Sequence, residues 1–361
     1  MKKFLGVILP MLIGGVCGAA GAAFGVSLVP ELGGIQDVIL IVLSLFVSIY
    51  LHIILHEGGH LVCGLLSGYK FVSFRVGSRM LMKSNGKYMV KKFNIPGTGG
   101  QCLLDPPGDM AENYPMKLYN LGGGLSNFLF SAIATVITVN TDSIAVKEVL
   151  IPFIILGVAL GATNLIPMKV SGIANDGYNI LSLDKDTAGR KAFWQQMRVN
   201  RLSTDGVRLK DMDESLFDVA ASEAEGNPLI DQIKLFWMQR LIDEKRFEEA
   251  RDFGRKLIHA KDSIQIFKLM VGVELLYLEL TGPCEADVVK ALYSKEIQKW
   301  LKAVKGYPST HRVLYAYATR FAHDEKMAAK AKRDFAKVCK TYPMLGEIET
   351  EKELFKEIEI V

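Results

Sequence analysis

The sequence predicts a mainly α-helical, polytopic membrane protein that carries a soluble α-helical domain in its C-terminal half. Of the 361 residues, 50% are hydrophobic, and the mean hydropathy of +0.21 is high for a soluble protein. The apolar excess is concentrated before about Leu183, where the chain has four long apolar runs and several glycine-rich pieces. Later residues alternate charged and apolar positions without a spanning run. We therefore expect an N-terminal membrane helix with an outer turn (1–34), a membrane core (35–183) and a helical domain (184–361).

The first part begins with Lys2 and Lys3, followed by apolar sequence over residues 4–28. A basic start and an apolar core are also the marks of a signal peptide. This run is longer than a usual signal core, and mostly small residues recur on one stripe, as helix packing in lipid favours: Gly14, Gly18, Ala22 and Val26. We expect a retained membrane helix with a cytoplasmic N-terminus, because basic residues stay on the cytoplasmic side.

A second apolar run covers residues 36–68. Residues 38–55 contain no Asp, Glu, Lys or Arg, and at helical rise this length crosses most of a hydrocarbon core. The second half of the run carries His56-Glu57-Gly58-Gly59-His60. Because residues four apart lie on one face of a helix, the two imidazoles can bind a single metal ion with Glu57 beside it. The run enters from the outside, so this motif lies in the cytoplasmic half of the helix.

This H-E-x-x-H pattern is typical of zinc hydrolases, in which the glutamate takes a proton from a water molecule that the metal activates. Chance, or a polar patch between packed helices, would produce the same residues. Ionisable residues inside a membrane helix cost free energy to bury, however, and therefore mark functional sites. His52 lies one turn before His56. It either lines a water path, supports a metal ligand, or pairs with a neighbouring helix, and the last alternative is favoured.

A β-hairpin insert is predicted after Gly68. Residues 69–76, 79–82 and 88–93 alternate in the manner of strands, and Asn85-Gly86 between them is a strong hairpin signal, since both turn residues must reach positive φ. The insert carries seven basic residues, which agrees with a cytoplasmic position: Lys70, Arg75, Arg79, Lys83, Lys87, Lys91 and Lys92. Residues 95–108 are rich in glycine and proline. We expect them to form an irregular loop that is covered by protein or lines a watery cavity.

Two further membrane helices are expected at residues 117–139 and 149–168, joined by a polar outer segment. The first contains Gly122-Gly123-Gly124-Leu125-Ser126-Asn127, which on its own indicates close helix packing. The second ends in Asn164-Leu165-Ile166-Pro167 and leads to Asn175-Asp176-Gly177. By this topology Asp176 lies on the same side of the bilayer as the histidine pair. A carboxylate there would complete a three-ligand metal site with one open position.

Together, these motifs resemble those of the site-2 protease family of intramembrane zinc metallopeptidases. They occur in the family's order, and the resemblance covers about residues 35–183. It implies zinc held by His56, His60 and Asp176, Glu57 as the catalytic base, and a contact of Asn164 with the substrate backbone or the oxyanion. The hairpin and the glycine-rich loop would guide an extended substrate.

Two features depart from the family pattern. Gly124 stands where the family usually has proline, and the interval from Pro167 to Asp176 is longer than usual, with Asn175 in place of a common leucine. The long interval keeps Asp105, in Leu104-Asp105-Pro106, open as a rival metal ligand. The chain has no PDZ-like segment, which many bacterial relatives carry.

The soluble half is predicted to be helical throughout. Residues 189–201 form an amphipathic helix that rests on the membrane surface or packs on the following helices, and packing is favoured. Residues 231–242 and 247–258 are typical of a tetratricopeptide-like helical hairpin, and a looser unit covers 313–343. These features indicate an α-solenoid that binds a cytoplasmic protein partner, with a plain helical bundle as the alternative.

The predicted function is intramembrane zinc endopeptidase, acting within or near the transmembrane segment of a membrane protein or of a signal-peptide-derived substrate. A non-catalytic membrane scaffold that recruits partners through residues 184–361 is the alternative. A transporter is disfavoured, because it would show inverted repeats and further buried charges, and the sequence shows neither. A net charge of +4 without a basic, aromatic-interleaved stripe argues against nucleic acid. We expect a multi-pass protein of the bacterial cell membrane with a cytoplasmic C-terminal domain.

Overall fold

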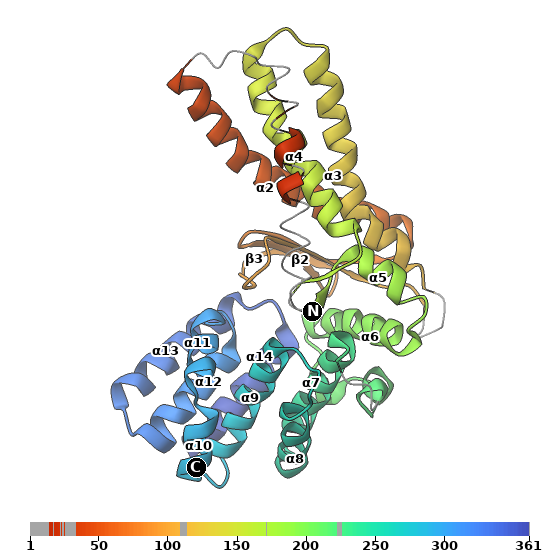
Figure 1. Cartoon of the computed structure of the whole chain (residues 1–361). Helices are drawn as coiled ribbons and strands as arrows, with labels where there is room; N and C mark the ends of the chain where they lie inside the picture. Colours follow the sequence, from red (N-terminus) through yellow and green to blue (C-terminus); the bar gives the residue numbers. More distant parts are fainter. Residues whose placement is uncertain are drawn as a thin grey trace. The chain divides into compact units, whose positions relative to one another are not determined.

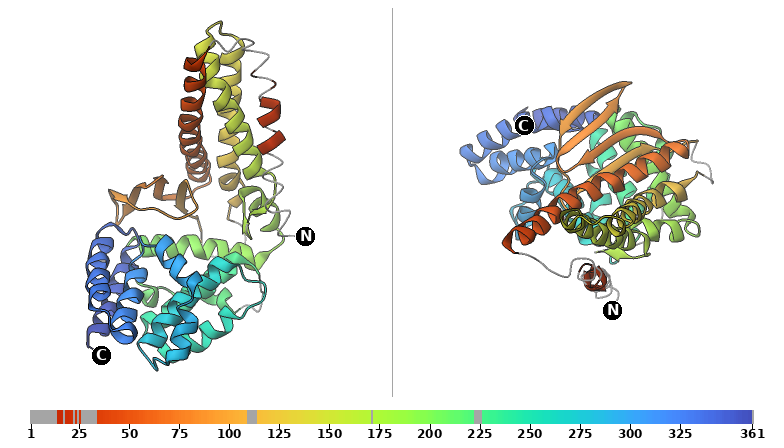
Figure 2. Two further views of the ribbon diagram at one scale, coloured as in Figure 1. Left: turned by 60° about the vertical axis from the view of Figure 1, so that its left-hand side comes forward. Right: turned by 90° about the horizontal axis from the view of Figure 1, so that it is seen from above.

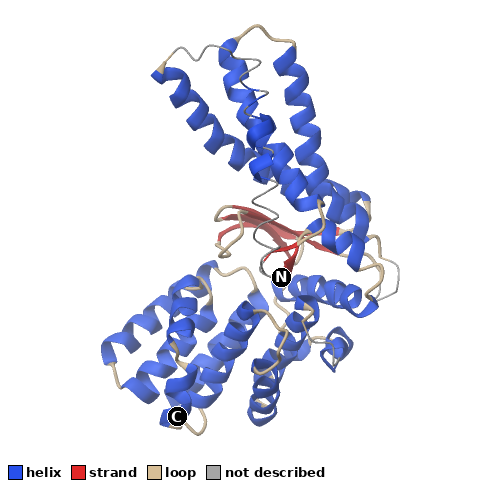
Figure 3. Cartoon of the chain, in the orientation of Figure 1, coloured by secondary structure: helices blue, strands red, loops and turns tan. Residues whose placement is uncertain are grey.

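The computed structural model describes residues 14–16, 18–21, 23, 25, 34–108, 114–170, 172–221 and 226–360. Within them the chain is mainly helical, with three helices long and apolar enough to cross a membrane and a small amount of sheet (Figures 1 and 3). The predicted first membrane helix at residues 4–28 and its outer turn lie largely outside the described residues. The predicted class is therefore confirmed in outline for the remainder of the chain.

The chain forms two compact units, each built from two segments. One contains residues 1–71 and 99–186, and the other contains 72–98 and 187–361. The boundary at residue 186 lies close to the predicted one at 183. The hairpin, expected as an insert of the membrane core, is grouped with the helical half.

The first unit is built on three packed helices: α2 (Ile35–Leu66), α3 (Met116–Val139) and α4 (Ile144–Leu165) (Figure 2). Glycines allow α2 and α3 to approach closely, because a Cβ at Gly59 or Gly122 would overlap the carbonyl group of the other. The outer segment predicted at residues 140–148 is shorter than expected. Helix α4 already begins at Ile144, and Glu148 within it is buried, with its carbonyl oxygen 3.5 Å from the Ser44 hydroxyl.

The prediction that residues 95–108 lack regular structure is wrong for their centre. Strand β4 spans Gly100–Asp105, and its Cys102, Leu103 and Leu104 side chains are buried. Leu104 reaches Gly64 of α2, where a Cβ would collide with it. The glycines and prolines that suggested a loop flank this apolar core, so tertiary burial stabilises a strand between them.

Strands β1 (Lys70–Val76), β2 (Arg79–Ser84) and β3 (Lys87–Lys92) form the predicted antiparallel hairpin meander, with Phe74 opposite Leu81 and Leu81 opposite Val90. Asn85 and Gly86 have φ of 48° and 79°, which confirms the turn prediction. Arg75 does not contribute to a basic surface. It is fully buried and donates hydrogen bonds to the Gly77 carbonyl oxygen and the Thr98 hydroxyl.

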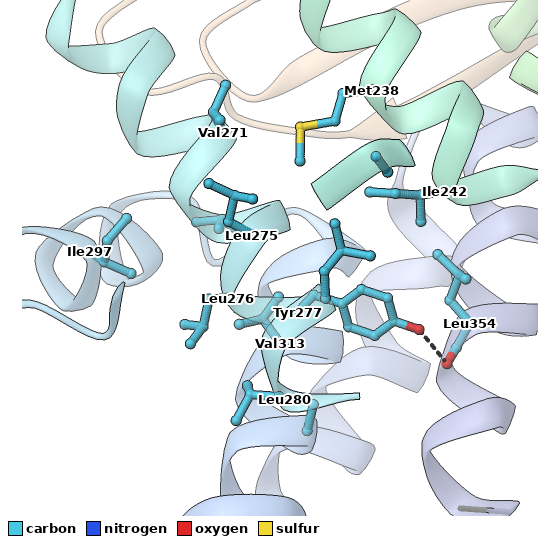
Figure 4. Packing of buried hydrophobic residues seen from close by; sticks show 14 of the residues in the cluster. Met238, Ile242, Val271, Leu275, Leu276, Tyr277, Leu280, Ile297, Val313 and Leu354 are labelled. Atoms are coloured by element: carbon cyan, nitrogen blue, oxygen red, sulfur yellow. Dashed lines mark hydrogen bonds between the residues drawn. The ribbon is translucent and has the colours of Figure 1, made fainter. Parts of the chain in front are cut away.

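The helical half contains nine α-helices and three short helical segments within the described residues, and one hydrophobic core joins most of them. They are α6 (Thr187–Thr204), 3₁₀ segments Leu209–Asp211 and Glu214–Ala221, α7 (Pro228–Asp243), α8 (Phe247–Ile258), α9 (Gln265–Leu280), α10 (Ala286–Leu292), α11 (Lys295–Ala303), α12 (Pro308–Tyr317), the π-helical turn Ala318–Ala322, α13 (Glu325–Thr341) and α14 (Leu345–Ile360). Figure 4 shows part of the core, in which the Tyr277 hydroxyl donates to the Leu354 carbonyl oxygen at 3.4 Å.

The last helix returns to the middle of this half. Arg312 of α12, fully buried, donates to Glu274 of α9 and to Glu351 of α14, at 2.8 Å in each case. In a solenoid each repeat contacts only its neighbours. Closure by α14 therefore fits the bundle alternative better, although α7 and α8 do pack as the predicted helical pair.

Helix α6 packs on α7 and buries Trp194 and Met197, which confirms packing as the role of its apolar face.

The hairpin is held to the C-terminal helices by an aromatic cluster. The ring of Phe93 lies 5.3 Å from those of Tyr307 and Tyr342, and the Lys91 ammonium donates to the Tyr342 carbonyl oxygen at 3.3 Å. The Tyr342 hydroxyl donates to Glu347 at 2.6 Å. Burial nevertheless raises the pKa of Glu347 to about 7, from an ordinary value of 4.5.

Replacement of Glu347 by Gln should reduce the pH dependence of stability in the helical half. The folded state holds a proton on Glu347 that the unfolded chain releases between pH 4.5 and about 7, so stability falls as pH rises through this window. The effect is at most about 3 kcal/mol. Trp194, Trp237 and Trp300, the three tryptophans of the chain, all lie in this half. Denaturant unfolding followed by their fluorescence at pH 5 and pH 8 measures the change, and equal losses in both proteins would contradict the assignment.

Candidate metal centre

Two histidines of α2 and an aspartate of α5 (Asp176–Ser182) meet at one point. The Nε2 atoms of His56 and His60 lie 3.1 Å apart, and the Asp176 Oδ2 atom is 3.5 Å and 3.4 Å from them. Among the described residues these three form the one group of three or more His, Cys, Asp or Glu side chains that could hold a metal ion. His60 is buried, and the other two are half-buried.

Hydrogen bonds at the opposite ring nitrogens orient both imidazoles. His60 Nδ1 lies 2.8 Å from the Tyr119 carbonyl oxygen, and His56 Nδ1 lies 3.3 Å from Asn127 Oδ1. Both partners are acceptors, so each Nδ1 carries a proton, and in the neutral rings each Nε2 keeps its lone pair. Two nitrogen lone pairs and a carboxylate oxygen therefore converge.

These donors fit a divalent metal ion. Tetrahedral zinc with bonds of about 2.0–2.1 Å separates its ligand atoms by about 3.3 Å, and the three observed separations span 3.1–3.5 Å. Two imidazoles and one carboxylate form a three-ligand set of the kind that leaves a fourth position open. Other divalent metals accept the same ligand types, so the donor set alone does not select zinc.

Asn175 determines where Asp176 lies. Its side-chain oxygen accepts from the backbone N–H of Met168 and Tyr178, and its amide donates to the carbonyl oxygens of Thr163 and Ile166, at distances of 2.7–3.1 Å. Asn175 thus caps α5 and ties it to the end of α4.

The long interval before Asp176 is a small β-hairpin. Strands β5 (Lys169–Val170) and β6 (Ile173–Ala174) pair across Gly172, whose φ is 89°. The extra residues form this hairpin, so the chain returns after it to the place where the hairpin began. Gly177 then packs so closely on the Leu165 carbonyl that a Cβ there would overlap it. The additional length is therefore compatible with Asp176 as the third ligand.

The glycine run of α3 has two functions. Gly122 allows the close approach to α2 that its sequence indicates, whereas Gly123 faces the imidazoles. A Cβ at position 123 would lie 2.5 Å from His56 Cε1 and from His60 Nε2. A side chain there would compete with a metal ion for the same space. Gly124 faces the Leu165 side chain with similar closeness.

Glu57 is half-buried and lies against β4. A Cβ at Gly100 would lie 2.5 Å from its Oε1 atom, so the absence of a side chain at position 100 makes room for the carboxylate. Burial raises the pKa of the Cys102 thiol, and the negative charge of Glu57 raises it further. The Tyr119 hydroxyl donates to the Cys102 carbonyl oxygen at 2.9 Å. The backbone carbonyl of the same residue orients His60. Strand β4 thus supports both the carboxylate and one ligand.

Three other predicted residues have different surroundings. His52 is fully buried and pairs with neighbouring helices, as favoured: its Nε2 is 2.8 Å from the Phe153 carbonyl oxygen of α4. The Asn164 amide donates to the Leu160 carbonyl oxygen at 2.8 Å, and its substrate contact stays a prediction. Asp105 is buried at the end of β4 and is not part of the three-residue group.

The motifs that contain Asn127 and Asn175 do not reveal the positioning roles of these residues, and Tyr119 belongs to no motif. Buried amides inside apolar helices are a signal that could have found Asn127. The contribution of Tyr119 is a backbone carbonyl, which no residue type reveals.

In comparisons with known proteins, no family model, curated protein or solved structure matches the chain.

Asp176→Asn should lower metal affinity by more than about 100-fold, whereas Asp105→Asn should leave it near normal. A neutral amide is a poorer ligand than a carboxylate, and even partners outside the ligand set contribute about 10–100-fold. Metal dissociation constants measured by chelator competition on the full-length chain in detergent test this. The reverse outcome would make Asp105 the third ligand.

Proposed function

We propose that the chain is an intramembrane metalloendopeptidase of the site-2 protease type, which cleaves peptide bonds within or near the transmembrane segment of a membrane protein or signal-peptide-derived substrate. The observation that carries the proposal is the convergence of Asp176 with His56 and His60, which flank Glu57 on a helix apolar enough to cross a membrane. Motif order in residues 35–183 supports the same family resemblance.

His56, His60 and Asp176 would hold the metal, for which we propose Zn²⁺. When bound, such an ion supplies a Lewis acid that polarises the scissile carbonyl group and activates water. Glu57, next to His56 on the helix, acts as general base toward the attacking water and then delivers the proton to the leaving amine. Because Gly100 has no side chain, strand β4 leaves room for the Glu57 carboxylate beside it.

The substrate would bind in an extended conformation. A peptide bond inside a helix is shielded by its own hydrogen bonds, so the substrate helix must unwind before attack. Gly99 and Gly100 leave the backbone beside Glu57 without side chains, which suits close approach of an extended peptide. We assign guidance of the substrate to this segment and the hairpin, and a contact with its backbone or the oxyanion to Asn164.

Basic residues at the N-terminus and in the hairpin support a cytoplasmic location for these two segments. The metal site and the helical half would lie on the same side of the membrane. We further propose that the membrane is a bacterial cell membrane. Residues 187–361 would then recruit or regulate without contributing to the chemistry.

Glu57→Gln should separate the enzyme from the alternative scaffold. The amide is nearly the same size and is not a metal ligand, so folding and metal content should be preserved while cleavage falls by about 10²–10⁴-fold. Membrane peptides compared between cells with the intact chain and with Glu57→Gln would reveal uncut precursors. His56→Ala is the control that should lose metal and cleavage together.

An unchanged peptide inventory in Glu57→Gln cells, together with a changed phenotype when the whole protein is deleted, would contradict the protease and favour a scaffold.

A further inference from the structure

A chain of hydrogen bonds links all three described membrane helices to one metal ligand. It begins at the Phe153 carbonyl oxygen of α4, which lies 2.8 Å from His52 Nε2 on α2. His52 Nδ1 lies 3.2 Å from Asn127 Nδ2 on α3, and Asn127 Oδ1 lies 3.3 Å from His56 Nδ1. His52 and Asn127 are both fully buried, so water does not compete for these bonds.

Only one direction of donation is consistent along this chain. A carbonyl oxygen only accepts, so His52 Nε2 carries a proton, and in the neutral ring Nδ1 must then accept. Asn127 therefore turns its NH₂ group to His52 and its oxygen to His56. That oxygen accepts the Nδ1–H of His56, which leaves the His56 Nε2 lone pair directed at His60 and Asp176.

We propose that His52 and Asn127 are positioning residues that impose the metal-binding tautomer of His56. The inference rests on the proposed metal site but not on hydrolysis. It also gives α4 a part in metal binding, because the Phe153 carbonyl oxygen sets the His52 tautomer that accepts from Asn127.

Packing around His52 holds its ring in the position needed for the hydrogen bond to the Phe153 carbonyl oxygen. The His52 and Phe153 rings stack with centroids 4.0 Å apart. A Cβ at Gly157 would overlap the His52 ring and the Ser131 hydroxyl, so glycine at this position admits the imidazole between the helices. His60 needs no such relay, because its Nδ1 partner is the backbone carbonyl of Tyr119, which cannot turn around.

The relay predicts a specific pattern of metal affinity in a double-mutant cycle. His52→Phe keeps a stacking ring but removes both bonds, and Asn127→Leu removes the acceptor for His56. Each should weaken Zn²⁺ binding about 10–100-fold. Because His52 acts through Asn127, the double variant should bind no more weakly than Asn127→Leu alone. Ser131→Ala, which alters the neighbour of His52 beside Gly157, is the matched control and should bind like the wild type.

Asn127→Asp provides the rescue. A carboxylate presents an acceptor to His56 whichever way it turns, so it needs no partner to orient it. In that background His52→Phe should no longer weaken Zn²⁺ binding. Dissociation constants from chelator competition and the absorption spectrum of bound Co²⁺, both on the full-length chain in detergent, give the readouts. Normal affinity in His52→Phe, or a loss that persists with Asp at position 127, would overturn the relay even if the protein is a protease.

A separate feature lies in the helical half: a cleft of about 470 Å³ between α11, α12 and α13. Its size is within the range of ligand sites. The rim carries three exposed lysines, Lys302, Lys305 and Lys330, against one carboxylate, Asp334. His311 in the cleft is buried, and burial lowers its pKa, so it is neutral at pH 7 and leaves the lining with an excess of two positive charges.

Most of the floor of the cleft is apolar, although buried Thr310 and His311 also line it. Leu301 and Ala331 are buried, and Leu314 and Met327 are half-buried beside them. We infer that the cleft binds an acidic peptide segment of a protein partner, with aliphatic side chains in the floor and carboxylates at the lysine rim. A membrane surface could meet the lysines but would not insert a side chain into the recessed floor.

A fluorescent twelve-residue peptide with Glu and Leu alternating at helical spacing tests this cleft. Binding to the full-length chain at about 0.15 M salt should weaken at least about tenfold with Lys302→Glu and Lys330→Glu together. Lys326→Glu with Lys337→Glu makes the same charge change on exposed positions of α13 outside the lining and should have less than about a threefold effect. Equal losses would indicate general charge attraction. Binding of anionic vesicles without binding of the peptide at about 100 μM would identify a membrane contact instead, and either result would overturn the inference.

Discussion

Three electron pairs that converge without a proton between them are the constraint on which the first unit depends. The Nε2 atoms of His56 and His60 and the Asp176 carboxylate meet within 3.5 Å, and both imidazoles are held as acceptors at this point. Such an arrangement repels itself unless a cation is present, and the low dielectric of buried surroundings increases the repulsion. If a metal ion binds here, its binding would be coupled to the packing of α2, α3 and α5, because each would require the geometry of the other.

Small residues and buried amides, rather than large apolar side chains, maintain this geometry. Gly59 and Gly122 bring the two helices into backbone contact, and Gly123 leaves the space in front of the imidazoles. Asn127 and Asn175 then orient a histidine and an aspartate through hydrogen bonds that have few competitors in a buried site. In lipid, where burial of apolar area does not drive helix association, close contacts and polar bonds of this kind carry the specificity.

The helical half is organised by different forces. Its core is assembled by burial of apolar side chains from α7 to α14, and the ion triad of Arg312, Glu274 and Glu351 closes the last helix onto α9 and α12. The hairpin contacts the C-terminal helices through a separate cluster of Phe93, Tyr307 and Tyr342.

The sequence alone determined the helical class, the spans of α2 and α3, the hairpin turn at Asn85-Gly86 and the pairing of His56 with His60. These follow from local rules: apolar length, turn residues that accept positive φ, and the i, i+4 spacing of a helix. Asp176 was reached only through motif order and topology, with Asp105 left as a rival. Tertiary structure decided what depends on residues distant in the chain. It formed β4 inside a glycine- and proline-rich stretch, because burial of Cys102 and Leu104 outweighs weak local propensity. It folded the long interval before Asp176 into a hairpin, and it brought Asn127 between His52 and His56, since the partner of a buried hydrogen bond is set by packing in space and not by spacing along the chain.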